Sequence, residues 1–112
     1  MSMDLQVWSA QPFKFPEQLP KADSWKRWED SWQYDGANWL INVSIEEDEP
    51  DDSVTGKLPT AKHMAFVSLE PIAANAEGYA FLEEVTRGLC RQTGGVWVEP
   101  SGEVYFHDEG KC

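Results

Sequence analysis

The chain has 112 residues, of which 20 are acidic and nine are basic, so its formal net charge is −11 at pH 7. Charge of this sign repels nucleic acids and anionic membranes and favours basic partners. Hydrophobic residues make up 41% and aromatic residues 12% of the sequence, which argues against a disordered chain and suffices for a single domain spanning 1–112.

The first predicted elements are a strand over about 4–9 and an extended crossing segment after it. The stretch 11–20 contains Pro12, Pro16 and Pro20. Proline lacks the backbone N–H that a strand donates to its neighbour, so these residues prevent regular strand pairing.

The stretch KADSWKRWEDSWQY follows, with Trp25, Trp28 and Trp32 at positions i, i+3 and i+7. This spacing places three indoles on one helical face and predicts a short helix over about 23–30. The competing interpretation begins a strand near Trp32, because Trp32 and Tyr34 also alternate with polar residues.

Residues 31–46 have the pattern of a β-hairpin, with the turn cluster DGAN between SWQY and WLINVSIE. Alternation of apolar and polar residues in the second arm predicts a strand that buries one face. We expect Trp28 and Trp39 to be buried. Residues 47–60 are predicted to form a long acidic loop, and residues 62–69 a further strand.

The clearest predicted helix covers about 76–92, where Asn75 can cap the first turn. Its apolar stripe consists of Phe81, Leu82, Val85 and Leu89. Gly94 can adopt the left-handed conformation that ends a helix, and two strands are expected around a turn at 99–102. The order of elements predicts an α+β fold, a single antiparallel sheet with helices on one face, of which a ferredoxin-like arrangement is one variant.

The stretch EEDEPDD at 46–52 is the strongest charge feature of the sequence. Its acids are Glu46, Glu47, Asp48, Glu49, Asp51 and Asp52. An EF-hand is excluded, because a loop starting at Asp48 would have Pro50 at its third position and Ser53 where glycine is needed. The run is either a solvated loop or a surface that binds a basic partner, and we take its six acids as candidate partner-binding residues.

Candidate catalytic and metal-binding residues are few. His63 and His107 are the only histidines, and neither they nor Cys90 and Cys112 form a CxxC, HxH or HExxH pattern. Cys90 lies at the apolar edge of the predicted helix, which favours a buried structural thiol. The sequence therefore predicts a protein that is not an enzyme and that has no metal ion or cofactor.

The segment FLEEVTRGLCRQTGGVWVEPSGEVYF, within residues 75–109, resembles the C-terminal ending of small bacterial immunity proteins from polymorphic-toxin and contact-dependent inhibition systems. In those proteins an amphipathic helix ends at a Gly-Gly pair and is followed by two strands around a turn. The resemblance implies a small acidic protein that binds and neutralises a toxin domain. The alternative is a glycan- or peptide-binding module that uses surface tryptophans.

The remaining expectations concern location. No apolar run reaches the about 20 residues of a membrane-spanning helix. The first ten residues lack the basic and apolar regions of a signal peptide. Two cysteines are too few for a disulfide scaffold. We therefore expect a cytoplasmic protein with reduced thiols, which binds neither nucleic acid nor membrane.

Overall fold

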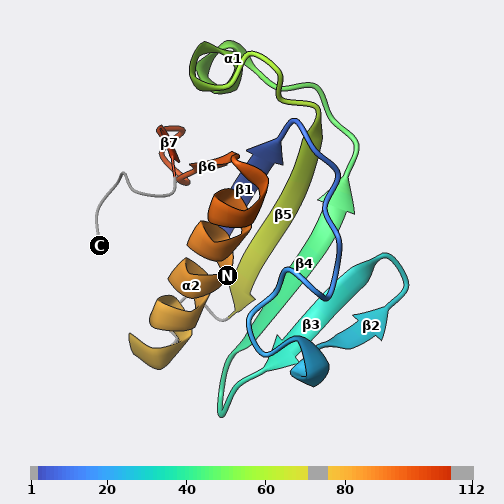
Figure 1. Cartoon of the computed structure of the whole chain (residues 1–112). Coiled ribbons are helices and arrows are strands. Elements are labelled where there is room, and N and C mark those ends of the chain that lie inside the picture. Colours follow the sequence, from blue (N-terminus) through green and yellow to red (C-terminus); the bar gives the residue numbers. More distant parts are fainter. Residues whose placement is uncertain (1–2, 71–75, 107–112) are drawn as a thin grey trace.

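The computed structural model describes residues 3–70 and 76–106, which form one antiparallel sheet with helices packed against it (Figure 1). The strands are β1 (Met3–Ser9), β2 (Lys26–Trp28), β3 (Ser31–Asp35), β4 (Leu40–Glu46), β5 (His63–Glu70), β6 (Val96–Val98) and β7 (Val104–Phe106). The helices are η1 (Ala22–Ser24), which is a single 3-10 turn, α1 (Asp52–Lys57) and α2 (Ala76–Thr93). The predicted α+β fold with one main helix is confirmed.

The strand order is β2-β3-β4-β5-β1-β6-β7, so the first strand of the chain lies inside the sheet. Val7 in β1 pairs with Ala65 in β5 on one side and with Trp97 in β6 on the other. α2 connects β5 to β6 across β1, which gives one split βαβ unit. A ferredoxin-like fold has two such helical crossovers. Here the described chain has only one, because β1 leads into the β2–β5 meander.

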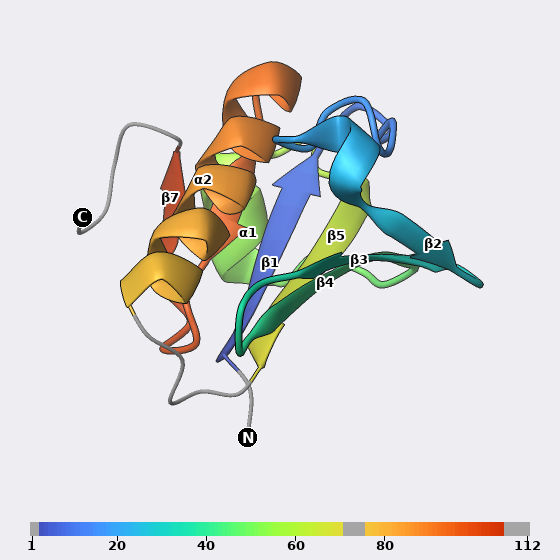
Figure 2. The same ribbon diagram turned by 90° about the horizontal axis from the view of Figure 1, so that it is seen from below.

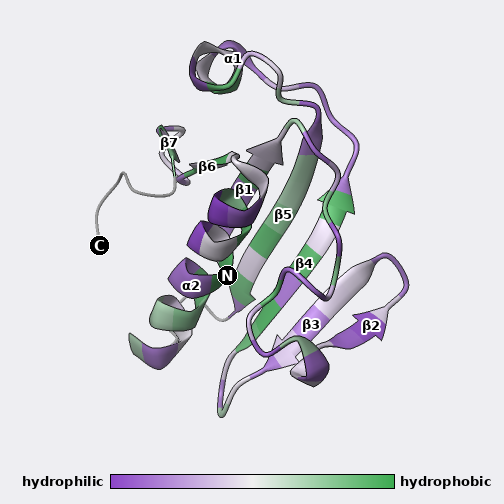
Figure 3. Cartoon of the chain, viewed as in Figure 1, coloured by the Kyte–Doolittle hydropathy of each residue, from purple (hydrophilic) through white to green (hydrophobic). Residues whose placement is uncertain are grey.

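The main core lies between α2 and one face of the sheet (Figure 2). The predicted apolar stripe of α2 is buried there, and Val85 and Leu89 are fully enclosed. Opposite them lie alternate residues of the central strands, including Val7, Ile41 and Val67. In Figure 3 hydrophobic residues are concentrated in β4 and β5, whereas β2 is hydrophilic. α2 ends as predicted, since Gly94 has a φ of +69°.

The segment between β1 and β2 covers the same face of the sheet as α2. Its first part folds into turns, in which Leu19 N–H donates to Pro16 O at 2.9 Å, so the expected extended crossing over 11–20 is replaced by a compact segment. Phe13 and Leu19 are buried in the main core, so this compact segment packs against the sheet.

The short helix expected over about 23–30 is present as the single turn η1, and the rest of that segment forms β2. The competing interpretation, a strand near Trp32, is confirmed by β3. Trp25 leaves η1 in an extended conformation, with φ −87° and ψ 138°. Its indole stacks near Phe81, with ring centroids 6.2 Å apart, and its Nε1–H donates to Pro20 O at 2.7 Å.

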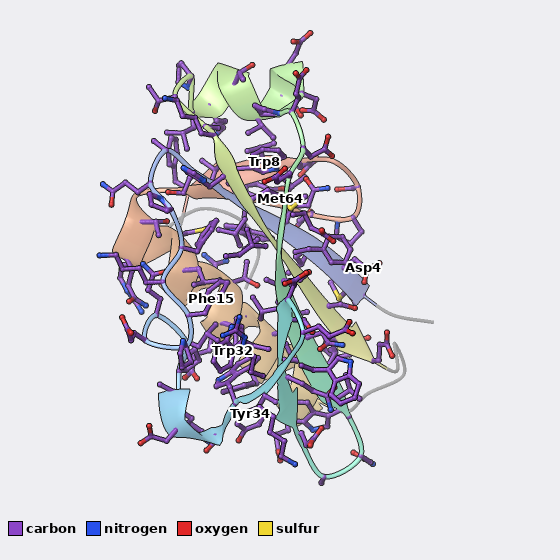
Figure 4. The ribbon with its side chains drawn as sticks, turned by 90° about the vertical axis from the view of Figure 1, so that its right-hand side faces the viewer. Asp4, Trp8, Phe15, Trp32, Tyr34 and Met64 are labelled. Carbon is purple, nitrogen blue, oxygen red and sulfur yellow. The ribbon has the colours of Figure 1, made fainter. Side chains whose placement is uncertain are left out.

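The predicted loop at 47–60 contains the helix α1, which the sequence analysis missed. Val54 of α1 is 1% exposed and belongs to a second core cluster with Trp8 and Met64, on the face of the sheet opposite α2. Figure 4 shows Trp8 and Met64 beneath α1, and Phe15, Trp32 and Tyr34 on the side that carries α2. A single buried valine in a polar stretch gives little periodic signal, which explains the omission.

Candidate functional site

Trp28 is the most exposed large hydrophobic residue of the described chain, at 72%. The expectation that it is buried is therefore wrong, whereas Trp39 is buried as predicted. Trp28 ends the edge strand β2 and pairs with Ser31 across a turn formed by Glu29 and Asp30. Edge position and strand alternation together turn its indole away from the core.

The β2–β3 turn lies next to the end of β4, where Ile45 is 47% exposed. Two shallow hollows lie beside the β2–β3 turn and the end of β4. Both are lined by Glu29, Asp30, Ile45 and Glu46. Trp28, Ser31 and Ser44 line one of them, whereas Phe15, Arg27, Trp32 and Glu47 line the other. We call the surface formed by Trp28, Glu29, Asp30, Ile45, Glu46 and Glu47 the acidic–aromatic corner.

Among the described residues, the cations near this corner form no ion pair with its carboxylates, although Arg27 lines one of the two hollows with them. Arg27 alternates with Trp28 along β2, so it points to the other face, where its guanidinium lies 5.9 Å from the Trp32 ring centroid. Lys26 pairs with Asp35 at 3.4 Å. Across residues 3–70 and 76–106, none of the corner's four carboxylates makes an ion pair. The corner therefore combines Trp28 on the face opposite α2 and Ile45 on the α2 side with four carboxylates that form no ion pair among the described residues.

The six predicted partner-binding acids separate into two groups. Glu46 and Glu47 belong to the corner, whereas Asp48, Glu49, Asp51 and Asp52 lead into α1 or begin it. Asp51 is the N-cap of α1, and its Oδ1 accepts from Ser53 N at 3.1 Å and from Val54 N at 3.2 Å. Hydrogen bonds from the Ser53 hydroxyl and from these two N–H groups lower the pKa of Asp51 below its usual value. Asp51 therefore has a structural role, and partner binding by the run stays a prediction.

Sequence analysis missed Glu29, Asp30 and Ile45 as members of this surface. No local sequence pattern identifies them as part of this surface. Residues 29–30 approach residues 45–47 only because β3 pairs with β4. The Trp-Glu-Asp-Ser stretch does have the composition of a turn, but the helical spacing of the tryptophans concealed it.

The candidate catalytic residues are dispersed. Cys90 is fully buried, as predicted, and burial raises the pKa of its thiol to about 12. A thiol in this state is a poor nucleophile at neutral pH. His63 is half-buried at the start of β5, and His107 lies outside the described residues. Within the described ranges, no three His, Cys, Asp or Glu side chains converge to hold a metal ion.

A further hollow lies between α2 and the β1–β6 part of the sheet. Its lining includes Leu5, Leu82 and Trp97, with Glu83 and Arg87 at its rim. Arg87 donates to Glu83 Oε1 at 2.8 Å, and its guanidinium lies 5.3 Å from the Trp97 ring centroid. Because these charged groups are already engaged with each other and with the indole, this hollow is a weaker candidate than the corner.

The tryptophans do not form a platform for stacking sugars. Trp25 is buried, Trp32 is half-buried on the α2 side of the sheet, and Trp28 points to the opposite face. The expected stripe of three indoles on one helical face is therefore absent from the structure, and the glycan-binding alternative loses its main support.

Comparison with family models, curated proteins and solved structures finds no match to this chain. No helix of the described residues is long and apolar enough to cross a membrane. The chemistry of the corner is therefore the main guide to function.

Proposed function

We propose that this chain is a non-enzymatic binding protein whose acidic–aromatic corner docks a basic protein partner. The observation that carries the proposal is the 72% exposure of Trp28 beside four carboxylates that have no ion-pair partner among the described residues. A side chain this exposed contributes little to the stability of the isolated fold, whereas tryptophan is among the residues that most often dominate the energy of protein interfaces.

In this proposal, charge increases the rate of association and buried apolar area stabilises the complex. The carboxylates of Glu29, Asp30, Glu46 and Glu47 attract a basic surface and speed its encounter with the chain. Trp28 then loses water on contact, and this desolvation holds the complex together; Ile45, which points to the α2 side of the sheet, adds apolar area only where the partner wraps around the edge. The chain's net charge of −11 adds to the attraction and disfavours nucleic acid as the partner.

The more specific version of the proposal is an immunity protein, which neutralises a cognate toxin by covering its active surface. Its support is the small size and acidity of the chain and the resemblance of the segment 75–109 to the ending of such proteins. A toxin that cleaves nucleic acid needs a basic surface for its polyanionic substrate, and an acidic corner is complementary to that surface.

The decisive experiment uses the protein encoded by the gene next to that of this chain, because toxins and their immunity proteins are usually encoded together, and the proposal predicts that this protein is basic. We expect the two proteins to bind and expect co-expression to relieve the toxicity of the neighbour. The Trp28→Ala variant and the Glu29→Gln, Asp30→Asn double variant should each weaken binding by roughly tenfold or more.

The matched control is the double variant Glu77→Gln, Glu84→Gln, which removes the same charge from exposed positions of α2. It should retain nearly all of the affinity. Wild-type affinity in both corner variants would refute the proposed site. Absence of any complex with the neighbouring basic protein would refute the immunity assignment.

A further inference from the structure

The hollow between α2 and the β1–β6 part of the sheet has a volume of about 150 Å³. Figure 2 shows α2 alongside β1, and the side chains of Leu5, Leu82 and Trp97, all buried members of the main core, line the hollow there. An apolar cavity of about 150 Å³ is large enough to bind benzene. The hollow therefore has the size and the lining for a molecule with a single aromatic ring.

The charged groups of this hollow favour a neutral occupant. Arg87 is already engaged, since it donates to Glu83 Oε1 and its guanidinium lies against the Trp97 ring. Glu99 also lines the hollow, so an anionic ligand would meet two carboxylates and a guanidinium that has a partner. Placing a further charge among apolar side chains without a partner is costly.

The wall of the hollow contains a hydrogen-bond donor that lacks an acceptor. The Nε1 atom of Trp97 is buried and makes no hydrogen bond within residues 3–70 and 76–106. An indole N–H can only donate, and nearly all buried polar groups in proteins have a partner. Leaving such a donor unsatisfied disfavours the empty state of the site. A ligand oxygen would supply the acceptor that this indole lacks.

Thr86 supplies the complementary acceptor. Its side chain lines the hollow and is almost fully buried. Its hydroxyl hydrogen is used within α2, because Oγ1 donates to Leu82 O at 2.8 Å. A hydroxyl oxygen that donates its hydrogen can still accept a hydrogen bond. A hydroxyl is the smallest neutral group that both accepts from an indole N–H and donates to such an oxygen.

We propose that this hollow binds a neutral phenol with a single aromatic ring. The ring packs against Leu5, Leu82 and the Trp97 indole. The phenolic oxygen accepts from Trp97 Nε1–H, and the phenolic hydrogen is donated to Thr86 Oγ1. The hollow shares no lining residue with the acidic–aromatic corner, so this inference is independent of the proposed function.

The first test uses the wild-type chain and the probes phenol, anisole and toluene. Phenol accepts and donates a hydrogen bond, anisole only accepts, and toluene does neither. We expect phenol to shift the indole N–H signal of Trp97 downfield in a proton–nitrogen NMR spectrum, with half-saturation near about 1 mM. Toluene should not cause this downfield shift. The Trp97→Phe variant assigns the signal by its disappearance.

The indole N–H signal of Trp39 is the internal control for this shift. Its Nε1 is also buried and has no acceptor in the described part of the chain, but Trp39 does not line this hollow. Its signal should therefore stay in place when phenol is added. Equal shifts of the Trp39 and Trp97 signals would indicate a general solvent effect and would overturn the proposal.

The second test removes the acceptor. Thr86→Val keeps the shape of the side chain and should weaken phenol binding roughly tenfold, while anisole and toluene binding stay nearly unchanged. Thr93→Val is the matched control, because Thr93 Oγ1 makes the same bond within α2, to Leu89 O at 2.7 Å, and lies outside the hollow. Thr93→Val and the corner variant Trp28→Ala should both bind phenol as tightly as wild type.

Several results would overturn the proposal. They are absence of saturable phenol binding, saturation without a shift of the Trp97 signal, and unchanged phenol affinity in Thr86→Val. Benzoate should bind roughly tenfold more weakly than phenol, and equal or tighter binding of benzoate would contradict a neutral ligand. Unfolding curves show whether each variant is folded. If Thr86→Val does not fold, the Trp97 signal of the wild-type chain still decides between the two outcomes.

Discussion

Trp25 and Trp28 are three residues apart, yet Trp25 is 6% exposed and Trp28 is 72% exposed. The difference arises because Trp25 follows the single turn η1 and points into the aromatic cluster beneath α2, whereas Trp28 ends an edge strand and points to the face of the sheet opposite α2. One indole stabilises the fold and the other is available to a partner.

The first prediction follows from that contrast. Trp25→Ala should lower the free energy of unfolding by about 3–5 kcal/mol, as expected for an aromatic residue removed from a core. Trp28→Ala should change it by less than about 0.5 kcal/mol, as expected for an exposed residue. Urea unfolding followed by circular dichroism measures both values, and equal losses in the two variants would contradict the assignment.

The second prediction concerns the cap of α1. Asp51→Ala should destabilise the protein by about 0.5–2 kcal/mol, because two N–H groups lose their acceptor. Asp48→Ala, four residues before α1 and without a capping role, is the control and should have little effect.

The cap also predicts a pH dependence. The pKa of Asp51 is lowered in the folded state from its usual value of 3.8, so its contribution is present above pH 3.8 and is lost as pH falls through the lower folded value. The stability difference between wild type and Asp51→Ala should therefore shrink in acid. A difference that stays constant down to about pH 2 would show that the carboxylate does not cap α1.

The third prediction concerns two glycines with opposite surroundings. A Cβ at Gly95 would lie 2.2 Å from the backbone oxygen of Trp8, so Gly95→Ala should destabilise the β1–β6 pairing by about 1–3 kcal/mol. A Cβ at Gly56 in α1 would meet nothing within 4 Å, so Gly56→Ala should stabilise the protein by about 0.5–1 kcal/mol. Thermal unfolding of the two variants should shift in opposite directions.

The fourth prediction concerns Cys90. In a Cys112→Ser variant, Cys90 is the sole thiol of the chain. Its complete burial and its pKa of about 12 should keep it unreactive toward a disulfide reagent at neutral pH until the protein unfolds. Because this pKa is raised from 9.0, stability should also fall as pH rises above 9.0. Rapid reaction in the native state would show that α2 opens readily.

Much of the fold follows from local sequence patterns. The alternation in WLINVSIE marks β4, and the apolar stripe with Gly94 behind it marks α2 and its end. These signals are local, since each arises from the side-chain period of one element. The strand order cannot be predicted from these local patterns, because it depends on contacts between β1 and residues far along the chain.

The candidate site could be predicted only in part for the same reason. Glu46 and Glu47 are visible as part of a charge run, but their neighbours Glu29 and Asp30 come close through hairpin pairing. The spacing of Trp25, Trp28 and Trp32 fits a helical face. Pairing of β2 with β3 overrides this local preference, so Trp28 becomes exposed.

The interior position of β1 has a consequence for synthesis of the protein on the ribosome. β1 emerges well before its partners β5 and β6, and β6 is the later of the two. Until then the hairpins from β2 to β5 can pair among themselves, whereas both hydrogen-bonding edges of β1 are complete only when its last partner has been made. β1 therefore gains its second partner only after β6 has been made, and a nascent chain cut off before Val96 leaves one edge of β1 open to pairing with a second molecule.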